Sequence, residues 1–90
     1  MDLEKTYQCL AELAEKLGIS LRYEDLSSSD VTPNGGLCRV KGRYLFIMDT
    51  SKDLTQRIRA LSQCLARMNL DGIYVIPAVR ALLERLDKEG

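Results

Sequence analysis

The sequence predicts one small α+β domain, in which helices pack on a three- or four-stranded, mostly antiparallel sheet. Three segments repeat apolar residues at intervals of three and four, as amphipathic helices do. Between the first two, shorter segments alternate apolar and polar residues or are apolar throughout, as strands are. The 90 residues, 46% of them apolar and 29% charged, suffice for one core, so we expect a single domain over residues 1–90.

The first helix is predicted to follow Asp2, whose carboxylate can cap its N-terminus, and to end at Gly18. Its apolar side chains share one face, namely Leu3, Tyr7, Leu10, Leu13, Ala14 and Leu17. Residues 19–24, ISLRYE, alternate apolar and polar and predict the first strand. Residues 25–36 collect Ser, Asp, Thr, Pro, Asn and Gly, so we expect a long exposed loop.

A hairpin is predicted next, with Lys41 and Gly42 at its turn, because glycine accepts the positive φ that tight turns need. Its arms are residues 37–40 and 43–49. Residues 44–48 are apolar at every position, which is typical of a strand covered on both faces, by its own domain or by a partner. We therefore place this strand in the middle of the sheet.

The second helix is predicted over residues 54–68 and is the element on which the core is built. Ser51 or Thr50 can cap it, and Asn69 or Gly72 ends it. One apolar stripe runs along it, formed by Leu54, Ile58, Leu61, Leu65 and Met68.

Residues 73–76, IYVI, form either a short edge strand or an extended connector, because Pro77 disfavours a helical conformation at Ile76. Pro77 suits the first turn of a third helix, whose inward residues are Val79, Leu82, Leu83 and Leu86. The predicted order is therefore α, β, β, β, α, an optional β, and α.

The chain contains no histidine, which removes the commonest general base near neutral pH and the commonest metal ligand. Cys9, Cys38 and Cys64 stand far apart and form no CxxC pair. We expect no enzyme, no metal and no cofactor, and reduced thiols typical of a cytoplasmic protein. The chain start shows no signal-peptide pattern, and no apolar stretch is long enough to span a membrane, which also favours the cytoplasm.

The residues around Cys38 are the candidates for contacting a ligand or an anion. Arg39, Lys41 and Arg43 follow Cys38 closely, and positive charge lowers the pKa of a thiol. Strand alternation instead places Cys38 on one face with Val40, away from Arg39 and Lys41, where burial would raise that pKa. A small ligand-binding or thiol-dependent protein that uses these residues is an alternative function.

The net charge is zero, but the charges are unevenly distributed along the sequence. Residues 1–34 carry three basic and seven acidic side chains, residues 35–68 seven and two, and residues 69–90 three and four. The thirds can neutralise one another on folding, and a neutral total argues against strong binding to nucleic acid. Weak nucleic-acid binding through the basic middle third is a further alternative, with Arg39, Lys41, Arg43, Lys52, Arg57, Arg59 and Arg67 as phosphate contacts.

Three segments together resemble the minimal zinc-metallopeptidase domain of bacterial repressor-cleaving and phage-immunity regulators: LAEKLGISLRYEDL, GLCRVKGRYLFIMD and LTQRIRALSQCLA. The resemblance covers residues 10–66 and implies a zincin-like scaffold. In that family the last helix carries H-E-x-x-H, where this sequence has Ser62, Gln63 and Ala66. Both zinc-binding histidines and the glutamate base are missing, so the resemblance implies a degenerate scaffold without the enzyme.

The stretch from Gly35 to Arg80 also resembles a family of small uncharacterised bacterial proteins. These share a Gly-Gly-Leu-Cys-Arg segment and a helix that begins Pro-Ala-Val-Arg. This second resemblance implies a common fold and no particular activity.

A non-enzymatic protein-interaction or self-associating module is the function that these observations favour. The partner we expect is a protein, with a homodimer or another homo-oligomer as the simplest case, and no membrane; the sequence specifies no small molecule. An exposed sheet edge or apolar segment usually marks association. The candidate interface is therefore a sheet edge or the segment of Ile73, Tyr74, Val75 and Ile76.

Overall fold

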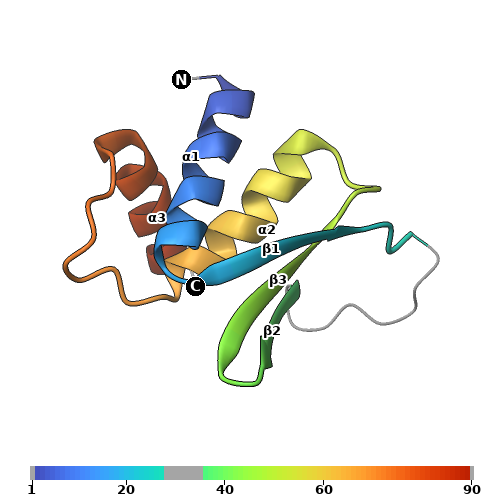
Figure 1. Cartoon of the computed structure of the whole chain (residues 1–90). Coiled ribbons are helices and arrows are strands. Elements are labelled where there is room, and N and C mark those ends of the chain that lie inside the picture. The colour runs from blue at the N-terminus through green and yellow to red at the C-terminus, as the bar shows by residue number, and fades with distance from the viewer. Residues whose placement is uncertain (1, 28–35, 90) are drawn as a thin grey trace.

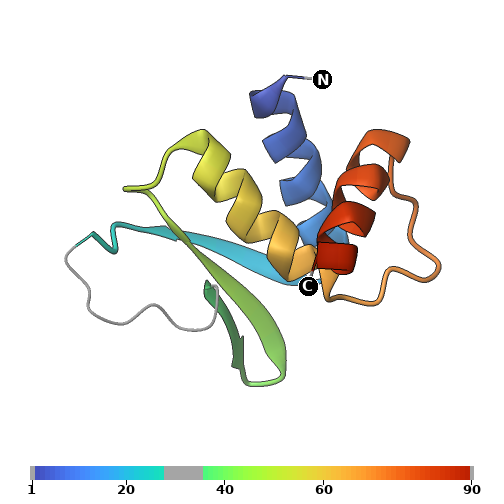
Figure 2. The ribbon, with the colours of Figure 1, turned by 180° about the vertical axis from the view of Figure 1, so that it is seen from behind.

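Three helices lie on one face of a three-stranded sheet (Figure 1) in the computed structural model, which describes residues 2–27 and 36–89. The view from behind shows the helices on the same side of the strands (Figure 2). This arrangement is the small α+β fold predicted from the sequence. Its elements are α1 (Leu3–Lys16), β1 (Ile19–Glu24), β2 (Leu37–Val40), β3 (Arg43–Asp49), α2 (Leu54–Ala66) and α3 (Pro77–Glu89).

The sheet has the strand order β1-β3-β2, which confirms the central position predicted for β3. It is a mixed sheet and not a mostly antiparallel one. The hairpin makes β2 antiparallel to β3, from Leu37 opposite Phe46 to Val40 opposite Arg43. In contrast, β1 runs parallel to β3, because the connection through residues 25–36 and β2 returns the chain to the end of the sheet where β1 begins. The middle of that connection, residues 28–35, lies outside the described residues.

Side-chain caps fix the starts of α1 and α2. Asp2 accepts a hydrogen bond from the Lys5 N–H at 2.7 Å, as predicted. At α2 the cap is Asp53, not Ser51 or Thr50: its carboxylate accepts from the Gln56 N–H at 2.8 Å, while the Gln56 side chain accepts from the Asp53 N–H at 3.1 Å. This reciprocal capping box satisfies two backbone donors at once, which is more than a single hydroxyl can do.

The core lies between the helices and the covered face of the sheet. Leu10, Leu61, Leu65, Phe46 and Met48 are almost completely buried there. Residues 73–76 form no strand; they connect α2 to α3, and their Val75 is buried at 5% exposure. No helix within the described ranges combines the length and the apolar character that crossing a bilayer demands.

Candidate functional site

Within residues 2–27 and 36–89, one face of the sheet carries no helix, and we call it the open face. Phe46 and Met48 on β3 are buried beneath the helices, so the alternating residues Leu45 and Ile47 point to the opposite side. The strand registers then assign nine residues to the open face: Ser20, Arg22 and Glu24 from β1, Arg43, Leu45, Ile47 and Asp49 from β3, and Cys38 and Val40 from β2.

The centre of the open face is apolar and its ends are charged. Leu45 and Ile47 are partly exposed, Cys38 lies beside Leu45 in the register, and Val40 is 51% exposed. Antiparallel sheets that face water normally place polar residues there. The apolar centre therefore departs from the pattern of a solvated face.

Charges of opposite sign occupy the two ends of β3 on this face. Arg43 stands at one end and Asp49 at the other, with Leu45 and Ile47 between them. On β1, Arg22 lies 3.5 Å from the Glu24 carboxylate in an exposed ion pair. An exposed ion pair of this kind stabilises the fold little, so Arg22 and Glu24 can form contacts with a partner in its place at little cost.

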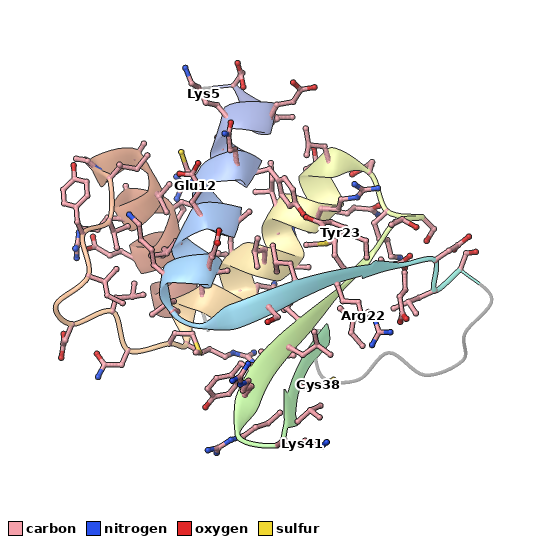
Figure 3. All side chains as sticks on the ribbon, in the orientation of Figure 1. Lys5, Glu12, Arg22, Tyr23, Cys38 and Lys41 are labelled. Atoms are coloured by element: carbon pink, nitrogen blue, oxygen red, sulfur yellow. The ribbon has the colours of Figure 1, made fainter. Side chains whose placement is uncertain are left out.

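The predicted ligand site of the hairpin is divided between the two faces. Cys38 and Arg43 belong to the open face, whereas Arg39 lies on the helix side, where its guanidinium is 5.6 Å from the centre of the Tyr44 ring. Lys41 is at the turn, with φ of +53°. Figure 3 shows Cys38 and Lys41 on the hairpin, away from the helices, and Arg22 pointing away from the side of β1 that carries Tyr23. The structure therefore does not bring the four predicted contacts together at one concave site.

The other predicted surface, Ile73 to Ile76, is mostly part of the core. Val75 is buried, and Ile73 and Ile76 pack against the core. Only Tyr74, at 71% exposure, remains available. It borders a hollow of about 120 Å³ beside α1, which Cys9 and Lys16 also line.

A larger hollow, of about 530 Å³, lies where β1 and β3 end and α2 begins. Its carboxylate, Asp49, is already used: it accepts from the Ser51 hydroxyl at 2.7 Å, the Ser51 N–H at 2.9 Å and the Leu26 N–H at 3.1 Å. The Ser51 contacts, the hydroxyl first, lower the pKa of Asp49 below its ordinary value. Asp49 therefore stays ionised near neutral pH, where it stabilises the turn after β3 and does not act as a proton acceptor.

Two basic side chains, Lys52 and Arg57, line this hollow, and Arg57 is used in the same way. Arg57 donates from Nε to the Lys52 carbonyl at 2.9 Å and from Nη2 to the Thr50 carbonyl at 2.8 Å. The N-terminus of α2, which would otherwise attract an anion, is closed by the Asp53 carboxylate. The Asp49, Arg57 and Asp53 side chains therefore fix the connection between β3 and α2.

The positions that the zinc resemblance singled out lie on α2, on the side that faces α3. Ser62 is 1% exposed, and with Gln63 it lines a groove of about 520 Å³ between α2 and α3. Its Oγ has no hydrogen-bond partner in the described part of the chain. Among the described residues, no three His, Cys, Asp or Glu side chains gather as a metal would require.

A groove that the sequence analysis did not predict lies between α1 and the free edge of β1. Its volume is about 630 Å³. The signal in the sequence was the acidic outer surface of the first helix, but helix periodicity cannot reveal which neighbour that surface meets. The lining consists of Gln8, Ala11, Glu12, Glu15, Gly18, Ile19, Ser20 and Leu21.

These surfaces define a two-layer α+β domain with one open sheet face and one acidic groove at a strand edge. Comparison of the chain with protein-family models, characterised proteins and solved structures found no match. The resemblances to the zinc-metallopeptidase scaffold and to the Gly-Gly-Leu-Cys-Arg proteins therefore stay predictions.

Proposed function

We propose that this chain is a non-enzymatic protein-interaction domain that associates with a second copy of itself through the open face of its sheet. The observation that carries the proposal is the apolar character of β3 on both sides, of which the helices cover only one. Burial of Leu45 and Ile47 against a partner would recover about 25 cal/mol for each Å² of apolar surface removed from water.

A second copy is the partner because the charges on β3 complement themselves. A two-fold axis that lies midway between the two sheets, perpendicular to β3 and level with Phe46, reverses the strand of the other copy. Arg43 of one copy then lies opposite Asp49 of the other, and Leu45 lies opposite Ile47. The turn contacts of Asp49 all use its Oδ1, so its Oδ2 can receive the Arg43 guanidinium. Such an isologous contact closes after two copies. Two sheets stacked in this way lie about 10 Å apart, and the side chains of their open faces interdigitate, as in a β-sandwich.

The same arrangement explains why neither alternative function is favoured. The hairpin cations needed for a ligand or a nucleic acid point to different faces, and Arg57 is bonded to backbone carbonyls. A self-associating module needs no common pocket and no catalytic group. It needs an apolar face with complementary charge, and the open face has both.

Sedimentation equilibrium from micromolar to millimolar concentration tests the proposal. The unmodified chain is expected to show a monomer–dimer equilibrium, and Leu45→Lys to weaken it at least about tenfold by placing a charge in the centre of the contact. Gln63→Lys, which adds the same charge on the exposed surface of α2, is the matched control and should leave the equilibrium unchanged. A strict monomer at all concentrations would overturn the proposal, as would an equal effect of both variants.

A further inference from the structure

The strand β1 is an edge of the sheet with a groove beside it. It pairs only with β3, so the backbone groups on its other side have no strand partner in the described structure. Unpaired groups of this kind are a template for another extended chain. The groove that runs along Ile19 to Leu21 gives such a chain space next to α1.

The wall of this groove is acidic. Glu12 and Glu15 of α1 line it, and no basic side chain of the described residues does. Glu12 also borders the smaller hollow that Lys16 and Tyr74 line. Neither carboxylate has an ion-pair partner within 4.0 Å among residues 2–27 and 36–89, although Lys16 follows Glu12 at the spacing that favours a pair within a helix. Two unneutralised carboxylates beside an open strand edge favour a positively charged occupant.

Small residues keep the groove open at both walls. Ala11 stands on α1 between the longer polar side chains, and Gly18 forms the turn from α1 into β1 with φ of +80° and no atom within 4 Å of an added β-carbon. A backbone can therefore approach β1 without meeting a bulky side chain at the turn. Leu21, which is partly buried, offers an apolar contact along the floor.

We propose that this groove binds an extended segment of another protein, which adds to the β1 edge as a strand and carries basic side chains toward α1. Main-chain hydrogen bonds to β1 would supply the affinity. Every second side chain of the added strand would face α1, so lysine or arginine at alternate positions would reach Glu12 and Glu15. The groove shares only Ser20 with the open face, at the edge of that face, so strand addition leaves Leu45 and Ile47 available for self-association.

A second copy is the rival occupant, since its β2 edge carries Arg39. That strand has four residues, whereas β1 offers six. The contact would also be heterologous, so it would not close on itself and would produce chains of undefined length. A foreign extended segment uses the whole edge and leaves the dimer intact.

The test uses synthetic peptides and fluorescence anisotropy with the full chain. A labelled peptide that alternates lysine and valine is expected to bind, and its glutamate–valine counterpart to bind at least about tenfold more weakly. A lysine peptide N-methylated at every residue keeps its charge but has no backbone N–H to donate on either edge, and it should also bind at least about tenfold more weakly. Absence of binding by the lysine peptide, or equal binding by the methylated peptide, would overturn the proposal.

Protein variants locate the site and separate it from the dimer. The double variant Glu12→Gln and Glu15→Gln should bind the lysine peptide more weakly than the unmodified chain does. Glu84→Gln, on the exposed surface of α3, should bind the peptide as tightly as the unmodified chain. Sedimentation of the double variant should match that of the unmodified chain. If the unmodified chain formed open-ended assemblies at high concentration and the double variant did not, β2 of a second copy would be the occupant of the groove. The assignment to a foreign segment would then be wrong. A dimer lost by Leu45→Lys with peptide binding retained would show that the two proposals stand separately.

Discussion

Gly36 lies against the carbonyl group of Ile47 so closely that a β-carbon on Gly36 would stand 2.6 Å from that oxygen. Gly36 also has φ of +84°, a conformation that costs other residues about 1 to 2 kcal/mol. It is buried at the start of β2, where the chain passes the half of β3 that β2 does not pair with. Only glycine meets both demands.

Gly36→Ala is therefore expected to lower the free energy of unfolding by about 2 kcal/mol or more, measured by urea denaturation. Gly72→Ala is the matched control, because Gly72 has φ of +78° with nothing within 4 Å of an added β-carbon. The Gly72→Ala variant should lose only the free energy that a positive φ costs a residue with a β-carbon. Equal losses for the two variants would mean that the contact with Ile47 is not restrictive.

Ser62 gives the opposite expectation, because its buried hydroxyl has no partner within the described residues. A buried polar group without a hydrogen bond costs about 1 to 3 kcal/mol, so Ser62→Ala should leave stability unchanged or raise it by about 1 kcal/mol. Ser51→Ala removes a hydroxyl that does bond, to Asp49, and should lower stability. A clear loss for Ser62→Ala in urea denaturation would show that its hydroxyl is satisfied in solution.

Tyr7 and Tyr23 link α1 to β1 through their hydroxyl groups, which are 3.1 Å apart. Burial first, and then the contact with Tyr23, raise the pKa of Tyr7 above its ordinary value. The folded state therefore favours the protonated phenol, and its contribution is complete below pH 10 and is lost as the pH rises above that value. Stability measured by urea denaturation should decline in this alkaline range. Tyr7→Phe should make the decline shallower, and an unchanged slope would contradict this cause.

Local patterns were enough to predict the helices, the hairpin and the central strand. Most of the apolar residues that repeat along α1, α2 and α3 touch the same core, although Leu3 is 52% exposed. Lys41 and Gly42 both adopt the positive φ of a tight turn. Each of these features depends on residues close together in the sequence. The physical cause therefore lies within the segment itself.

Features that depend on distant partners could not be predicted. Nothing within β1 distinguishes a parallel neighbour from an antiparallel one, because either exposes the same alternating side chains. Four apolar residues were too few to show that Val75 enters the core as a connector. The acidic groove exists only because α1 crosses the edge of β1, and that contact is set by tertiary packing. The candidate site was thus the least predictable part of the molecule.

Cys38 provides a direct measurement of the proposed dimer, because it lies on the open face beside Leu45 without any substitution. Cys9 is also partly buried but belongs to α1, outside that face, and serves as the internal control. Cys64 is buried, which raises its thiol pKa, so it should react with iodoacetamide slowly at every concentration.

Alkylation rates of Cys38 and Cys9, followed by mass spectrometry as the protein concentration rises, therefore test the central claim. The open-face dimer predicts that Cys38 becomes protected in proportion to the dimer fraction while the rate at Cys9 stays constant. A dimer in which Cys38 reacts as fast as in the monomer would contradict it.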